Sequence, residues 1–167
     1  AYGAVGLQLL VRDRARHDRS GLDATLALGN TLLAALGYGT DLAALIETDD
    51  PDALRAALDA APLGTPSPSP ASFMPLDEKR RLMQLSLRAL HEAAPAPVDR
   101  VPLAAGAPFG AVVLDQAACT LCLACVSACP VAALSDNAEQ PMLRFSESLC
   151  VQCGLCAATC PEDALTL

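Results

Sequence analysis

The sequence predicts a small α/β domain with a parallel sheet over residues 1–94, a proline-rich linker over 95–108, and a small α+β domain over 109–167. Apolar runs alternate with segments of helical periodicity in the first part, which is typical of an α/β fold. Prolines punctuate the middle, and the last part repeats itself with a period of 31 residues. A chain of 167 residues is long enough to bury a core in addition to such a repeat.

The first half of the α/β domain begins with a strand pattern. Residues 4–11 form an apolar run typical of a buried strand. Residues 22–36 have helical periodicity, and the glycine at Gly37 predicts the end of that helix. A second apolar run, residues 42–46, predicts a second strand.

The second half of the α/β domain continues the alternation. Asp50 and Pro51 supply an N-cap and a first-turn proline for a helix that ends near residue 60. The proline-rich stretch 62–70 predicts an irregular loop, residues 71–74 a brief strand, and residues 76–93 an amphipathic helix. Three strands alternating with helices predict a parallel sheet with crossover connections, and an all-helical domain is the alternative.

Polar side chains follow the first two predicted strands, where open parallel sheets bind ligands. The residues are Arg12, Arg14, Arg16, His17 and Arg19 after the first strand, and Glu47, Thr48, Asp49 and Asp50 after the second. For the arginines we expect a solvated loop, with binding of a phosphate or an acidic partner as the alternative. For the acidic residues we expect Asp50 to cap a helix, with cation binding as the alternative. The sequence has no nucleotide-binding glycine motif and no recognisable catalytic arrangement. We therefore predict no catalytic centre of its own in this chain.

All eight cysteines lie in the last 49 residues, in two copies of the spacing C-x2-C-x2-C-x3-C-P. The first copy is Cys119, Cys122, Cys125, Cys129 and Pro130, and the second is Cys150, Cys153, Cys156, Cys160 and Pro161. Thiolates at this spacing hold four-iron clusters. Zinc sites and a disulfide framework are the alternatives, although zinc poorly explains the third cysteine and the proline.

The repeat extends beyond the cysteines, so that each half resembles a short strand, a cysteine loop and a proline-started helical turn. The pairs 31 residues apart are Val112 with Leu143, Leu114 with Phe145, Ala133 with Ala164, and Leu134 with Leu165. Residues from about 108 to 167 resemble the dicluster bacterial ferredoxin family. This resemblance implies an α+β ferredoxin-like dicluster domain with two antiparallel strand pairs, two short helices and two [4Fe-4S] clusters.

In dicluster ferredoxins the fourth cysteine of each run ligates the other cluster. The resemblance therefore implies one cluster on Cys119, Cys122, Cys125 and Cys160, and a second on Cys150, Cys153, Cys156 and Cys129. The first run departs from the second at Leu123, where the second run has Gly154. We expect the leucine to shield the first cluster from water.

Charge and hydropathy limit the partners and the location. Residues 101–167 contain six acidic side chains and one basic side chain, for a net charge of −5. Each oxidised cluster with its thiolates adds about −2. Such a surface disfavours nucleic acid and suits a redox protein with a basic patch. No apolar run approaches the roughly 20 residues of a membrane span, and no export leader is visible, so we expect a cytoplasmic protein.

These observations predict an electron-transfer protein that carries two [4Fe-4S] clusters between redox partners. The alternatives are an electron-relay module of a larger redox enzyme complex, of formate dehydrogenase or hydrogenase type, and an iron–sulfur scaffold or maturation protein. The abrupt start suggests a fragment of a longer chain. Residues 1–100 resemble the iron–sulfur subunit family of hydrogenases and heterodisulfide reductases at Gly29-Asn30-Thr31-Leu32-Leu33 and Leu36-Gly37-Tyr38. That resemblance implies a relay between a flavoprotein and a catalytic subunit.

Overall fold

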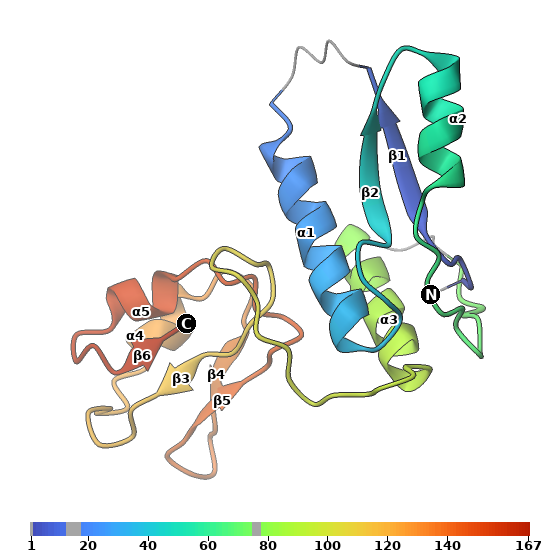
Figure 1. Ribbon diagram of the computed structural model, residues 1–167. Helices are drawn as coiled ribbons and strands as arrows, with labels where there is room; N and C mark the ends of the chain where they lie inside the picture. The colour runs from blue at the N-terminus through green and yellow to red at the C-terminus, as the bar shows by residue number, and fades with distance from the viewer. Residues whose placement is uncertain (1, 13–17, 75–77) are drawn as a thin grey trace. The chain divides into compact units, whose positions relative to one another are not determined.

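The computed structural model describes residues 2–12, 18–74 and 78–167 (Figure 1). These residues divide into two compact units, residues 1–102 and residues 103–167. Each unit is a small mixture of helices and short sheets. Among the described residues, no helix is both long and apolar enough to cross a bilayer.

The first unit is built around two parallel strands. Its elements are β1 (Leu7–Val11), α1 (Ser20–Ala35), β2 (Ala43–Glu47), α2 (Pro51–Asp59) and α3 (Lys79–Glu92). Strands β1 and β2 pair in register from Leu7 opposite Ala43 to Val11 opposite Glu47. Figure 1 shows α1 and α2 flanking this pair, and α1 contacts β2. The first two predicted strands and the first two helices are confirmed within a few residues, and the all-helical alternative is wrong. The predicted third helix is confirmed from Lys79, and its predicted start at residues 76 and 77 lies outside the described residues.

The predicted third strand at residues 71–74 is wrong. Residues 71–74 belong to none of the strands in the described part of the chain. Pro70 has no N–H to donate to a ladder. The hydroxyl of Tyr2 donates to the carbonyl oxygen of Phe73 at 2.5 Å, and the two rings lie 5.2 Å apart. A side-chain contact with the N-terminus therefore holds the segment, and the described sheet has two strands.

A left-handed glycine ends α1, as predicted, and directs the chain into the core. Gly37 has φ +80°, and its N–H donates to the carbonyl oxygen of Ala34 at 3.0 Å. The N–H of Tyr38 donates to the carbonyl oxygen of Leu33 at 3.0 Å, which completes a Schellman motif. The Tyr38 hydroxyl donates to the carbonyl oxygen of Leu90 in α3 at 2.8 Å. The buried core of this unit is Leu36, Tyr38 and Leu42, with Leu33, Leu90 and Ala94 packed against it.

One asparagine ties α1 to the edge of β2. The Asn30 side chain donates from Nδ2 to the carbonyl oxygen of Ala43 at 2.7 Å and accepts from the Ala43 N–H at 2.8 Å. The amide group of the side chain thus pairs both backbone groups of Ala43, as a neighbouring strand would. A partly buried backbone edge is satisfied in this way without a third strand.

We predict that Asn30→Ala lowers the free energy of unfolding of the first unit by roughly 1–3 kcal/mol, because both Ala43 backbone groups lose their partner. Urea unfolding of the full chain, followed by far-UV circular dichroism, measures the change. Thr31→Ala is the matched control, since the Thr31 hydroxyl donates only within the helix, to Ala27. Equal losses in the two variants would contradict the assigned role of Asn30.

The second unit consists of two antiparallel strand pairs and two short helices. Its elements are β3 (Val113–Leu114), α4 (Ala124–Ala128), β4 (Leu134–Asp136), β5 (Leu143–Phe145), α5 (Leu155–Thr159) and β6 (Leu165–Thr166). Strand β3 pairs with β6, and β4 pairs with β5, so each pair joins the start of one half to the end of the other. This arrangement is the one that the resemblance implied.

The predicted turn after each proline is present as a single hydrogen-bonded turn, in which the Ala132 N–H donates to the carbonyl oxygen of Cys129 and the Asp163 N–H to that of Cys160. The two helices of this unit lie before the prolines. Each helix lies between the third and fourth cysteines of its run, so that α4 contains Cys125 and ends before Cys129. After Cys129 the chain turns at Pro130 and enters a left-handed conformation at Ala132, with φ +50°. The N–H of Ala133 then donates to the Cys129 sulfur at 3.2 Å. The backbone thus turns around the Cys129 sulfur. If a helix continued past Pro130, the Ala133 N–H would not point at this sulfur.

The sequence repeat of the second unit is also a backbone repeat. Three pairs of positive-φ residues stand 31 residues apart: Leu121 (56°) with Gln152 (55°), Leu123 (61°) with Gly154 (77°), and Ala132 (50°) with Asp163 (49°). Five of these six residues carry a Cβ that disfavours this conformation. The same strained turns recur in both halves, which indicates that the cysteine loops require them.

Candidate metal centre

The cysteine loops are wound tightly by their left-handed residues. Leu121 lies between the first two cysteines of its run and Leu123 between the second and third, and both have positive φ. Gln152 and Gly154 occupy the same places in the second run. These positive-φ residues between the cysteines keep the loop compact, so that cysteines three and six residues apart line one cavity. An extended chain would instead carry them progressively apart.

Each cavity in the second unit is lined by cysteines from both runs. The first cavity, with about 370 Å³ of space that includes an opening to solvent, is lined by Cys119, Cys122, Cys125 and Cys160. The second, of about 330 Å³, is lined by Cys129, Cys150, Cys153 and Cys156. The structure thus brings all eight predicted site residues to two cavities, four to each. Every cavity has three sulfurs from one run and one from the other.

Apolar residues form most of the remaining wall of each cavity, and Thr120 and Glu162 also line the first. Leu114, Leu143 and Leu165 line the first cavity, and Val112, Leu134, Phe145 and Val151 line the second. The buried centre of the unit is Leu134, Cys156 and Leu165, and Val126 packs against it. Apolar residues therefore lie beside the cysteines in both cavities.

The sulfurs within each run are close enough to influence one another electrostatically. Burial raises the pKa of the Cys125 thiol, and the neighbouring Cys119 and Cys122 raise the pKa further, while nearby backbone amides oppose them. Burial raises the pKa of Cys156 in the same way, and Cys150 and Cys153 add to it. Three neighbouring thiolates repel one another, and bound cationic iron removes that penalty.

The fourth cysteine of each run has a different environment, dominated by amide donors. Burial raises the pKa of the Cys129 thiol, but backbone amides outweigh burial and the pKa is lowered overall. Among them is Ala133, whose N–H lies 3.2 Å from the sulfur. The second run repeats the contact, with the Ala164 N–H donating to the Cys160 sulfur at 3.4 Å. A backbone N–H thus donates to the sulfur of the fourth cysteine in both runs.

The donor set fits an iron–sulfur cluster better than a single ion. Across residues 2–12, 18–74 and 78–167, no group of three His, Cys, Asp or Glu side chains is arranged to hold one metal ion. A cubane cluster distributes its four thiolates over four irons, so its sulfurs stand farther apart than those around one ion. Four soft thiols around an apolar cavity are the ligands that such a cluster requires.

The two cavities differ at the position of Leu123. Leu123 is among the residues that line the first cavity, and Gly154, which has no side chain, is among those that line the second. Leucine is retained there although its φ of +61° suits glycine better. The expected shielding of the first site stays a prediction.

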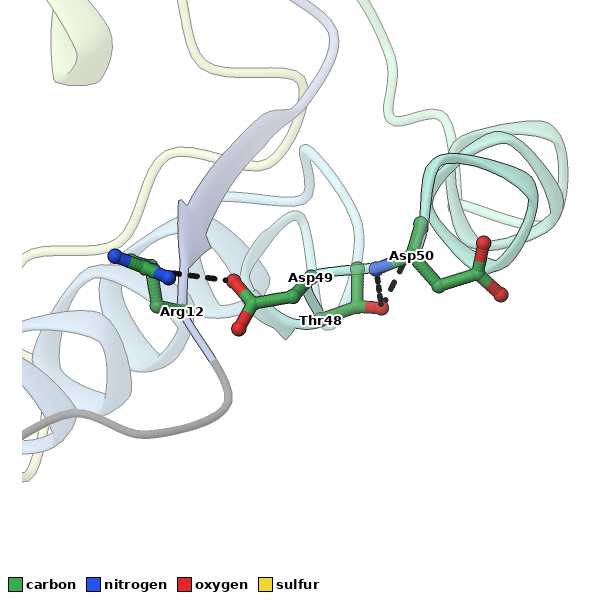
Figure 2. Close-up of polar contacts among 4 residues, drawn as sticks. All are labelled: Arg12, Thr48, Asp49 and Asp50. Carbon is green, nitrogen blue, oxygen red and sulfur yellow. Dashed lines mark hydrogen bonds and ion pairs between the residues drawn. The ribbon is translucent and has the colours of Figure 1, made fainter.

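The polar residues after β1 and β2 pair with one another. Arg12 Nε lies 3.2 Å from Asp49 Oδ1, and the Asp50 N–H donates to Thr48 Oγ1 at 3.0 Å. Figure 2 shows these contacts. Asp50 Oδ1 accepts from the Asp52 N–H at 3.0 Å, so the predicted helix cap is confirmed.

The other arginine described in this loop also has an acidic partner. Arg19 Nη1 lies 3.0 Å from Glu47 Oε2. Arg14, Arg16 and His17, together with Asp13, lie outside the described residues. Arg12 and Arg19 thus each face a carboxylate, which favours the solvated-loop interpretation over a phosphate site.

The sequence reasoning missed one polar contact at the cysteines. The Gln152 side chain donates from Nε2 to the Cys150 sulfur at 3.4 Å, and the Gln152 backbone N–H donates to the same sulfur at 3.4 Å. The signal available in the sequence was a difference between the repeats, because Leu121 occupies the matching place in the first run.

The comparison with known proteins is consistent with this geometry. Residues 118–165 match the family model of the 4Fe-4S dicluster domain. No curated protein matches the chain significantly. The family match covers less than a third of the chain and includes all eight cysteines. The resemblance of residues 1–100 to hydrogenase-associated subunits lies outside it and stays a prediction. Residues 118–165 are therefore a dicluster ferredoxin-type domain, a metal-binding iron–sulfur domain of electron transport.

Proposed function

We propose that this chain carries two [4Fe-4S] clusters and transfers electrons between redox proteins. One observation carries the proposal: two separate cavities in the ferredoxin-type domain are each lined by four cysteines. When bound, each cluster supplies a centre that takes up and releases one electron. The chain's residues hold it, exclude water and set its potential.

The proposed ligands follow the cavities. The first cluster is held by Cys119, Cys122, Cys125 and Cys160, and the second by Cys150, Cys153, Cys156 and Cys129. The support is that Cys160 lines the cavity of the first run and Cys129 that of the second run. Backbone amides at Ala133 and Ala164 donate to these two crossing sulfurs and stabilise negative charge there.

The proposed partners are redox proteins with a basic docking surface. The second unit contains six carboxylates and only Arg144 as a basic side chain. Bound clusters add further negative charge. Complementary charge increases the rate of encounter with a partner and orients it, without requiring a large apolar interface.

The domain organisation is part of the proposal. We place a small α/β domain at residues 1–94, a linker at 95–108 and the ferredoxin-type domain at 109–167, in the cytoplasm. Support comes from the division into compact units near residue 102 and from the prolines around that point. Residues 1–118 contain no cysteine, so every thiolate ligand available in the chain lies in the second unit.

The first prediction tests cluster content. After anaerobic purification we expect about eight iron and eight sulfide per chain, and an EPR signal from two reduced, magnetically coupled cubanes after dithionite. Zinc in place of iron, or clusters that dithionite and stronger reductants leave unreduced, would contradict electron transfer. The latter result would favour a scaffold or maturation protein.

A separate measurement distinguishes a carrier from a relay module. Stable co-purification with a catalytic subunit, of formate dehydrogenase or hydrogenase type, would assign the chain to a larger redox complex. Reversible exchange of electrons with a partner that binds transiently would instead support the carrier.

A second prediction tests the crossed ligand sets. The variants Cys122→Ser and Cys153→Ser serve as references. Their EPR and absorption spectra show which changes accompany loss of the first site and of the second site. We expect Cys129→Ser to reproduce the loss seen in Cys153→Ser, and Cys160→Ser to reproduce the loss seen in Cys122→Ser, because each fourth cysteine lines the other run's cavity. The assignment would be overturned if Cys129→Ser reproduced the loss seen in Cys122→Ser and Cys160→Ser reproduced the loss seen in Cys153→Ser.

A further inference from the structure

The two cysteine cavities differ in the donors that reach their sulfurs. Cys150, which lines the second cavity, accepts from both the backbone N–H and the side-chain Nε2 of Gln152, each at 3.4 Å. Leu121 holds the corresponding position in the first run and has no side-chain donor. The paired contacts at Ala133 and Ala164 are the same in both halves. The Gln152 amide is therefore an asymmetric addition to a symmetric scaffold.

Contact with Gly110 holds the Gln152 side chain in place. It lies against Gly110, where an added Cβ would come within 2.9 Å of Gln152 Cδ and 3.1 Å of its Nε2. The contact joins the segment before β3 to the second cysteine loop. A glycine at this place leaves the space that the carboxamide occupies. Gln152 is thus held on the backbone of the opposite half, with its N–H₂ directed at the sulfur.

Burial of Cys150 strengthens the effect of this hydrogen bond on the charge of the sulfur. Cys150 is buried, with 8% of its surface exposed, and Gln152 is partly buried. An N–H near a sulfur in a medium of low dielectric stabilises negative charge more strongly than the same contact in water. Gln152 does not line either cavity, so the carboxamide acts on the sulfur from outside the space that a cluster would fill.

We propose that Gln152 makes the two sites unequal, by raising the reduction potential of the cluster held by Cys150, Cys153, Cys156 and Cys129. The inference rests on the proposed function. Reduction adds one negative charge, which spreads onto the sulfurs, and an extra N–H donor stabilises the reduced form more than the oxidised form. The first electron therefore resides at the second site.

The test is an anaerobic redox titration of the full chain, monitored by EPR, for wild type and Gln152→Leu. Leucine keeps a side chain of similar size and removes the donor. We expect the midpoint potential of one signal, the one that Cys153→Ser removes, to fall, while the other signal and the iron content stay unchanged. Gln140→Leu is the matched control, because Gln140 lies exposed in the loop between β4 and β5.

A second variant tests the contact while keeping the glutamine. Gly110→Ala places a methyl group where the carboxamide lies, so Gln152 must move away from the sulfur. We expect the same signal to shift in the same direction as in Gln152→Leu. Unchanged potentials in Gln152→Leu, or equal shifts of both signals, would overturn the role of Gln152. Wild-type protein that assembles no iron–sulfur clusters would instead overturn the proposed function.

Discussion

The second unit depends on one constraint, which is that each cysteine-lined cavity requires both halves of the repeat. Three sulfurs come from one run and the fourth from the other. The strand pairs obey the same exchange, since β3 pairs with β6 and β4 with β5. Helices α4 and α5, which carry the third cysteines, also contact each other. One half alone would lack the fourth cysteine of its cavity, a strand partner and a packing surface.

The same constraint makes folding of the second unit depend on metal binding. The buried centre of this unit consists of Leu134, Cys156 and Leu165, and the residues around it include Cys125, Cys129 and Cys160. Cysteine thus takes positions that larger apolar side chains occupy in other small domains. A unit with so little apolar volume gains much of its stability from the groups that its thiolates bind. The strained turns at Leu121, Leu123 and Ala132 are retained because they direct sulfurs and amides to those groups.

Nearly identical halves allow small differences to give the sites different properties. The backbone conformations of the two cysteine loops agree closely, as Leu121 and Gln152 show with φ of 56° and 55°. The side chains at these positions differ in hydrogen bonding, and Leu123 and Gly154 differ in size. Because the two loops share one backbone conformation, a side chain that differs between them affects only the cavity beside it. If both cavities hold clusters, as proposed, these differences would give an electron a preferred position within the domain.

The sequence by itself determined the features that depend on local spacing and local conformation. The cysteine runs predicted a ferredoxin-type domain, Gly37 predicted the end of α1, and Asp50 with Pro51 predicted the start of α2, because each signal lies within one turn or one loop. Tertiary structure alone decided the contacts between residues distant along the chain. Phe73 contacts Tyr2 and forms no strand, Asn30 pairs with the backbone of Ala43, and Gln152 lies on Gly110. Such contacts depend on which backbone groups remain unpaired after the chain has folded, and that is a property of the whole fold.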